Sequence, residues 1–174
     1  SAWRTGSRPF LLRLQARNRR FSSFDPPPPD RRKMASIAQF SRLTLSGANK
    51  AVAAGLKEAE KMGVKVCVSV TDVGGNVLSM QRMDGTMPVA SEVATGKAIS
   101  AVKFARETKL LEGGCNSKDS GRSVLLSTPY ILMEGGIPII DPAHGGIIGA
   151  CGVSGVLPAQ DAQVAAAAVA ALSE

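Results

Sequence analysis

The segment from Lys65 to Asp84 constrains the fold more than any other part of this chain. Valine alternates with smaller residues over 66–70, and apolar residues return over 77–83, a pattern typical of two β-strands. The sequence DVGGN between them contains glycines that accept positive φ angles and favour a tight turn. The segment therefore predicts a β-hairpin, which needs further strands and helices to become stable.

A second hairpin is predicted near the C-terminal end of the chain. Two apolar runs, 137–140 and 147–153, are separated by the loop sequence DPAHGG. Gly149 and Gly152 lie inside the second run, and they indicate close approach by a ligand or by another backbone segment.

Three longer helices are predicted around these hairpins. Capping residues, apolar periodicity and early prolines place them over 44–62, 88–104 and 158–172. The region between the hairpins is less regular, with short helices expected at 108–112 and 117–126. This order of elements predicts an α+β fold, in which a single antiparallel sheet of about five strands is packed with helices.

The last predicted helix has the sequence AQDAQVAAAAVAAL, which is apolar almost all round. Such a helix is usually covered on more than one side, so we expect a homo-oligomer to bury part of it. No run of about 18 uncharged apolar residues occurs, and no membrane span is predicted.

The net charge of +7 comes from one end of the chain. Residues 1–33 carry nine basic and two acidic residues, whereas 34–174 carry twelve of each. Aromatic residues make up only 4% of the chain, so there is little with which to stack bases. Nucleic acid is therefore not an expected partner.

The Arg-rich front of the chain is typical of an organellar transit peptide. We expect residues 1–40 to be a disordered or transit-peptide-like tail, with Pro26–Pro29 as a stiff spacer, and residues 41–174 to be the folded domain. If 1–33 are native, the predicted location is a mitochondrion or another organelle. Alternatively Met34 is the start of the protein, which would then be cytoplasmic.

The three cysteines do not indicate a metal or disulfide framework. Cys67, Cys115 and Cys151 are odd in number and show no CxxC spacing. Cys67 and Cys151 lie in strand-like runs and are expected to be buried, whereas Cys115 is expected to be exposed. No metal site is predicted.

Four motifs together resemble the GlcG/HbpS family over residues 42–173: VTDVGGNVLSMQRMDG, ASEVATGKAISA, GGIPI and GGIIGACGVSG. The resemblance implies a profilin-like fold and an oligomer, often an octamer built from dimers. It also implies haem as a possible cofactor, since relatives include haem-binding proteins such as HbpS and the C-terminal domain of PduO. Because the family carries several chemistries, its fold does not by itself specify a function.

Candidate site residues gather around the first hairpin. Asp72, Arg82, Asp84 and Lys97 could bind an anionic ligand, or Lys97 and Asp72 could act in catalysis. Three of these residues also have a structural interpretation: Asp72 as a turn residue, and Arg82 with Asp84 as a salt bridge. His144, the only histidine, is either an idle loop residue or a ligand of haem iron.

Two functions follow from these residues, beside a third possibility of a scaffold without a ligand. The first is an oligomeric protein that binds haem, a related tetrapyrrole or another small anionic ligand at a cleft between protomers. The second is a cofactor-independent enzyme for a small carbonyl or keto-acid substrate. In that enzyme Lys97 is the amine or base, and Arg82 anchors a carboxylate.

Overall fold

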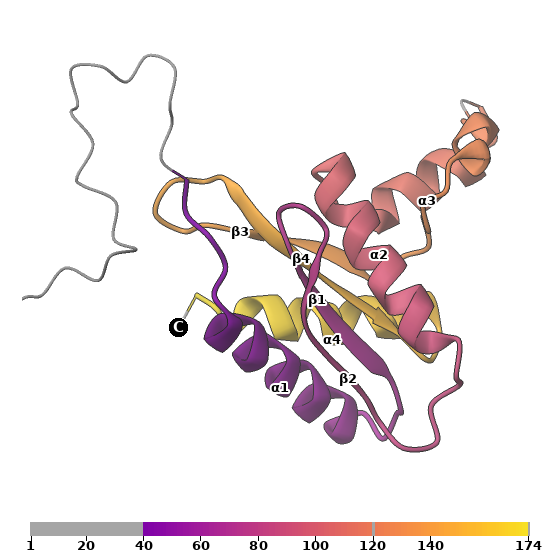
Figure 1. Cartoon of the computed structure of the whole chain (residues 1–174). Coiled ribbons are helices and arrows are strands. Elements are labelled where there is room, and N and C mark those ends of the chain that lie inside the picture. Colours follow the sequence, from indigo (N-terminus) through magenta and orange to yellow (C-terminus); the bar gives the residue numbers. More distant parts are fainter. Residues whose placement is uncertain (1–39, 120, 174) are drawn as a thin grey trace, which may run out of the picture. The chain divides into compact units, whose positions relative to one another are not determined.

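The computed structural model describes residues 40–119 and 121–173, and Figure 1 shows their arrangement. The predictions for the tail, including its transit-peptide character and the location of the protein, concern residues outside the described part. Residues from Phe40 onward form one compact unit. None of the described helices is both long and apolar enough to cross a membrane.

The described chain alternates helices with hairpins, as expected. In order, the elements are α1 (Leu45–Lys61), β1 (Cys67–Asp72), β2 (Val77–Arg82), α2 (Ala90–Phe104), α3 (Thr108–Asn116), the 3₁₀ helix η2 (Ser123–Ser127), β3 (Gly136–Ile140), β4 (Ile147–Ser154) and α4 (Pro158–Ala170).

The described strands form one antiparallel sheet in the order β2-β1-β4-β3. This confirms the α+β class and the single antiparallel sheet, but the sheet has four strands and not about five. The region between the hairpins supplies no additional strand among its described residues, because it forms α3, η2 and turns. The helix expected over 117–126 is also wrong, since only the short η2 forms there, shifted toward Ser127.

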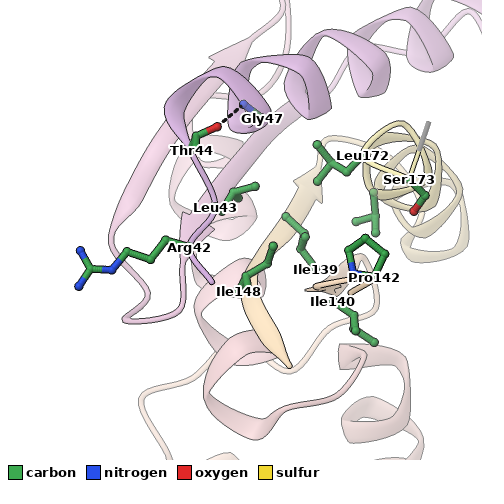
Figure 2. A pocket seen from close by; sticks show the side chains of 11 residues that line it. Arg42, Leu43, Thr44, Gly47, Ile139, Ile140, Pro142, Ile148, Leu172 and Ser173 are labelled. Atoms are coloured by element: carbon green, nitrogen blue, oxygen red, sulfur yellow. Dashed lines mark hydrogen bonds between the residues drawn. The ribbon is translucent and has the colours of Figure 1, made fainter. Parts of the chain in front are cut away.

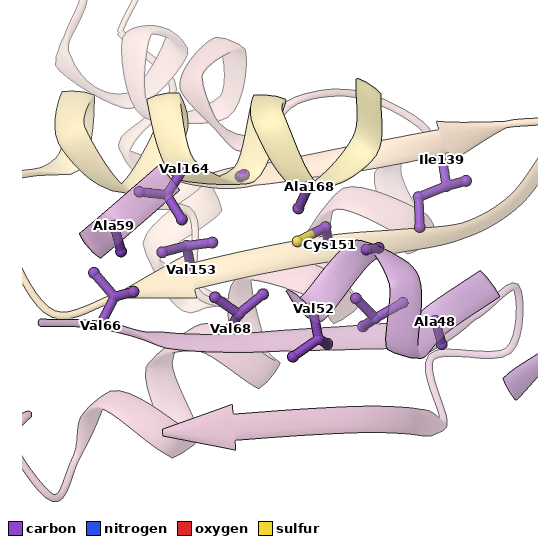
Figure 3. Close-up of a cluster of buried hydrophobic side chains, with 13 residues drawn as sticks. Ala48, Val52, Ala59, Val66, Val68, Ile139, Cys151, Val153, Val164 and Ala168 are labelled. Carbon is purple, nitrogen blue, oxygen red and sulfur yellow. The ribbon is translucent and has the colours of Figure 1, made fainter. Parts of the chain in front are cut away.

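Helices cover both faces of the sheet, with α1 and α4 on one face and α2 on the other (Figure 1). Strand β1 is buried on both sides: Val68 and Val70 face α1 and α4, while Cys67 packs with residues of α2. The larger core, shown in Figure 3, consists of Ala48, Ala51, Val52, Ala59, Val66, Val68, Val70, Ile139, Cys151, Val153, Val164, Ala165 and Ala168.

Helix α4 is covered on one side within the chain. It packs against the sheet and against α1, and its outward side is formed by small residues such as Ala159, Ala166 and Ala170. One side of α4 is thus buried within the chain, and the expected burial of its outer side in a homo-oligomer stays a prediction.

Two glycines of β4 allow close packing of backbone segments. A side chain at Gly152 would collide with the carbonyl oxygen of Ala94 in α2, and one at Gly149 would collide with that of Thr71 in β1. The close approach predicted for these glycines is therefore made by neighbouring backbone in both cases.

Candidate functional site

Lys97 lies in the middle of α2, with its side chain buried and ion-paired. Its Nζ is 2.7 Å from Oδ2 of Asp161 in α4, and both side chains are 2% exposed. The other oxygen of Asp161 accepts a hydrogen bond from the backbone N–H of Val156 at 3.2 Å. Burial raises the pKa of Asp161, although the hydrogen bond and charge of Lys97 act in the opposite direction.

The Lys97–Asp161 pair joins helices from opposite faces of the sheet, next to Gly135. The φ of Gly135 is +121°, and a Cβ there would lie 2.9 Å from Cβ of Asp161 and 3.0 Å from Nζ of Lys97. The missing side chain leaves room for the pair just before β3 begins. This arrangement makes Lys97 a buried connection between α2 and α4.

Asp72 ends β1 and organises the turn that follows. Its Oδ1 accepts a hydrogen bond from the backbone N–H of Asn76 at 2.8 Å, and the Asn76 side chain donates to both carboxylate oxygens. These hydrogen bonds, led by the one from the Asn76 side chain, lower the pKa of Asp72. The geometry matches the turn interpretation of this residue.

Arg82 and Asp84 lie at the opposite end of the hairpin from Asp72. Arg82 is paired with Cys67 at the start of β1, so about five residues, or roughly 17 Å of strand, separate it from the turn. Both side chains are exposed, and the ion pairs of the described residues do not include one between them. Asp72 therefore does not share one compact site with Arg82 and Asp84.

His144 lies in the β3–β4 loop and is held by a carboxylate that the sequence analysis did not single out. Its Nδ1 is 2.7 Å from Oδ2 of Asp141, and the Ser41 hydroxyl is 3.4 Å from the same nitrogen. The short contact assigns the proton to Nδ1, which donates to Asp141. The ring is 76% exposed, and its Nε2 has no hydrogen-bond partner among residues 40–119 and 121–173.

Asp141 is well suited to remain ionised beside the histidine. Hydrogen bonds from the Ser41 hydroxyl, the backbone N–H of Ala143 and the His144 ring lower the pKa of Asp141 to about 2. Because the ionised Asp141 carboxylate accepts the hydrogen bond from Nδ1–H, the ring is held in the tautomer in which Nε2 carries an unprotonated lone pair. The sequence feature that could have indicated this pair is the motif DPAH, in which the acid precedes the histidine by three residues.

An apolar cavity of about 230 Å³ adjoins the residues that flank this loop (Figure 2). Ile140 and Pro142, on either side of Asp141, contribute to its wall, and so do residues of the N-terminal approach to α1. Arg42 is at its rim with the guanidinium directed away from the cavity (Figure 2). The full lining is Arg42, Leu43, Thr44, Gly47, Ile139, Ile140, Pro142, Ile148, Val169, Leu172 and Ser173.

A second cavity, of about 280 Å³, lies between α3 and the segment before β3. Cys115 and Met133 bring two sulfur atoms to its lining, with Tyr130 and Leu132 beside them. Neither of the two cavities is lined by a residue of the cluster predicted around the first hairpin.

The remaining thiols belong to the core, as expected for Cys67 and Cys151. Both are buried, and burial raises the pKa of each thiol, for Cys151 to about 12. No cluster of three or more metal-binding side chains occurs among the described histidine, cysteine and acidic residues. An exposed imidazole with one nitrogen held by a carboxylate is an arrangement suited to binding a ligand through its other nitrogen.

Comparisons with known proteins agree on the relatives of this chain. Residues 43–170 match the model of a family described as "Haem degrading protein HbpS-like". Protein GlcG of Escherichia coli K12 is 42% identical over 108 residues, which cover 62% of this chain and 77% of GlcG.

Solved structures of HbpS and PduOC superimpose well on this chain. A double mutant of Streptomyces reticuli HbpS has a TM-score of 0.70 and 30% identity, with 84% of this chain and 97% of that chain covered. A structure described as a PduOC–haem complex has a TM-score of 0.67 and 28% identity, with 75% and 95% covered.

Proposed function

The chain belongs to the HbpS-like family, and from this premise we propose that it is a small-molecule-binding protein whose ligand is haem or a related tetrapyrrole. Two comparisons support the proposal: a PduOC relative was solved as a haem complex, and the family description itself names haem. The corresponding cofactor of this protein would be haem, an iron porphyrin with one apolar macrocycle and two carboxylates.

The observation that carries the proposal is the hydrogen bond between His144 and Asp141. Histidines that bind a metal through one ring nitrogen commonly donate the other N–H to a carboxylate, which fixes the ring and raises its basicity. His144 has this arrangement, with Nδ1 on Asp141 at 2.7 Å and Nε2 open to solvent. The donor set therefore fits haem iron, for which a single imidazole is a sufficient protein ligand.

The surroundings of the loop suit an apolar ligand that carries acidic groups. The adjoining cavity is walled by isoleucine, leucine, valine and proline side chains, which match the apolar body of a porphyrin. Arg42 extends outward from the rim, where it can pair with a carboxylate of a ligand larger than the cavity. Ser41, next to Arg42 in sequence, links this segment to the histidine.

The other predicted ligand-binding residues have less support in this role. Arg82 and Asp84 remain predictions, since they are exposed but line neither cavity. The alternative function, a cofactor-independent enzyme for a keto acid, needs Lys97 as a free amine. Its burial at 2% exposure and its pairing with Asp161 give that alternative little support.

Haem titration of the full chain tests the proposal. We expect the Soret band of haem to shift on binding, to a position typical of iron with a nitrogen ligand. In His144→Ala we expect the affinity for haem to fall at least tenfold. Asp141→Asn should retain haem more weakly than the unaltered chain, because a neutral amide oxygen accepts the Nδ1–H hydrogen bond more weakly than a carboxylate does. The matched controls are Cys115→Ala and Met133→Leu, which remove the sulfur atoms of the other cavity.

Two results would argue against this assignment. Unchanged binding and spectrum in His144→Ala would exclude the imidazole as the ligand, and loss of the band in the Cys115 or Met133 variants would move the site to the second cavity. If the unaltered chain gives no Soret shift at all, haem is not its ligand.

A further inference from the structure

The cavity of about 280 Å³ beside α3 is lined by both kinds of sulfur that the chain contains. Cys115, in the last turn of α3, and Met133, in the segment before β3, both contribute to its wall. Cys115 is half-buried, and Met133 is 44% exposed. A thiol and a thioether that line one cavity are a set of soft donors, which selects soft metal ions over hard ones.

Cys115 is the thiol of this chain that a ligand can reach. The other two, Cys67 and Cys151, are buried, and burial raises the pKa of both thiols, so neither readily forms a thiolate. Cys115 is partly exposed and takes part in no disulfide. A soft metal ion that enters this cavity therefore meets one thiol that can lose its proton, with a thioether on the same wall.

A hydrogen bond and an aromatic contact hold the walls of the cavity in place. The backbone N–H of Glu134 donates to Oε2 of Glu112 in α3 at 2.6 Å. The ring of Tyr130 packs edge-to-face against Phe104 of α2, with ring centroids 5.3 Å apart. The segment that carries Met133 is thus attached to α3 on one side of this residue and to α2 on the other, so the cavity is formed before a ligand arrives.

The charges around the cavity favour a monovalent cation. Glu112 lines the cavity, whereas Lys109 of the same helix is engaged with Glu134 at 3.0 Å. Cys115 and Asn116 are the last two residues of α3, so the cavity also lies at the negative end of the helix dipole. A monovalent cation on a thiolate forms a neutral pair, which is less costly to place in a partly apolar cavity than an unbalanced charge.

The donors of this cavity do not match zinc, calcium or magnesium. Zinc takes three or four nitrogen, sulfur or oxygen ligands from the protein, and the described lining residues offer one thiol, one carboxylate and no imidazole. Calcium and magnesium require several oxygen ligands, and one oxygen of the only carboxylate on this wall already holds a backbone N–H.

From these observations we propose that the cavity between α3 and the segment before β3 binds a soft monovalent cation, with Cu(I) as its biological form. The ligands are the Cys115 thiolate and the Met133 thioether. On binding, the Sγ–H bond of Cys115 breaks, a bond from sulfur to the metal forms, the proton passes to solvent, and the oxidation state of the metal is unchanged. The site shares no described lining residue with the cavity beside the β3–β4 loop, so it does not depend on haem binding.

Titration of the full chain, kept reduced and free of oxygen, tests the proposed site. The probes are Ag(I) added directly and Cu(I) in competition with a Cu(I)-specific chelator. We expect a single strong site, with an affinity lower by at least about a hundredfold in Cys115→Ser and about tenfold in Met133→Leu. Met80→Leu is the matched control, because Met80 is 43% exposed but lies on β2 and not on this cavity, and it should bind like the unaltered chain. Circular dichroism checks the fold of each variant.

X-ray absorption of the Cu(I) complex identifies the ligands directly. We expect sulfur neighbours in the unaltered chain and the loss of one of them in Met133→Leu. An unaltered chain without a strong site, an unchanged affinity in Cys115→Ser, or equal losses in Met133→Leu and Met80→Leu would each overturn the proposal. Nitrogen ligation would overturn it as well and would direct attention to His144. Because none of these measurements involves haem, this proposal and the haem proposal can fail separately.

Discussion

Two acid–base pairs of this protein show how burial of the basic partner decides what an ion pair can do. Lys97 and Asp161 are both 2% exposed and meet at 2.7 Å between α2 and α4. Asp141 and His144 meet at the same distance, but the imidazole is 76% exposed. The contacts are alike in length, and their surroundings give them different consequences.

The two carboxylates respond to these surroundings in opposite directions. The pKa of Asp161 is raised because burial disfavours its charge more than Lys97 favours it. The pKa of Asp141 falls to about 2 because several donors hydrogen-bond to its carboxylate, although that side chain is only 10% exposed. The buried pair therefore connects two helices, whereas the exposed pair leaves a nitrogen available to a ligand.

Removing one member of the buried pair should produce the largest effect. Lys97→Met leaves the Asp161 carboxylate buried without its cation, and we expect the free energy of unfolding to fall by about 3–5 kcal/mol. Chemical denaturation measures this loss. The double variant Lys97→Met, Asp161→Leu should recover most of it, because two apolar side chains can replace a buried ion pair at little net cost. A double variant as unstable as the single one would show that the charges themselves are needed.

The glycine beside the buried pair separates backbone strain from packing. Gly135→Ala adds a methyl group near both charged side chains at a φ of +121°, and we expect a loss of more than about 2 kcal/mol. Gly145→Ala is the matched control in the β3–β4 loop: its φ is +71°, but no atom lies within 4 Å of the added carbon. The control should lose only about 1 kcal/mol, the cost of the left-handed backbone. If thermal or chemical denaturation showed equal losses of stability in the two variants, packing against the buried pair would not contribute to the effect at Gly135.

The sequence predicted the architecture more completely than it predicted these pairs. Alternating valines and the two glycine-containing turns were sufficient for the hairpins and the single antiparallel sheet. Lys97 and Asp161, in contrast, are 64 residues apart, and only their packing brings them together. Lys97 was accordingly interpreted, from its position alone, as a cation that binds an anionic ligand or as a reactive amine.

Local spacing would have been informative for the exposed pair. Asp141 and His144 are three residues apart in one loop, so their contact depends on local geometry and much less on the sheet. The Ser41 contribution could not be predicted in this way, because it comes from a residue 103 positions earlier. The strand count was also wrong: the two predicted hairpins supply all four strands of the sheet, and no sequence pattern located the fifth.

The opposite pKa shifts should appear in the pH dependence of folding. A carboxyl whose folded pKa is depressed stabilises the protein above its unfolded value, near 3.8, and this stability disappears as pH falls toward 2. Asp141→Asn should therefore remove part of the loss in stability between about pH 4 and pH 2. Asp161 contributes with the opposite sign, because its raised pKa favours the folded state below the unfolded value and the advantage is lost as pH rises. Denaturant midpoints across this range, compared between Asp141→Asn and the unaltered chain, measure the difference. The same acid sensitivity in both proteins would contradict the shift.

The smallest expected effect concerns the hydroxyl that supports the exposed pair. The hydrogen bond from Ser41 is the largest cause of the lowered pKa of Asp141, followed by the backbone N–H of Ala143 and the His144 ring. Ser41→Ala should raise the pKa of Asp141 toward its ordinary value without reaching it, because the other two donors remain. Global stability should change by less than about 0.5 kcal/mol, since Ser41 is exposed. Carbon-detected NMR titration of the Asp141 carboxyl follows the pKa directly. An unchanged titration in Ser41→Ala would mean that His144 and the loop backbone alone hold the charge, and that the segment before α1 does not take part in positioning the imidazole.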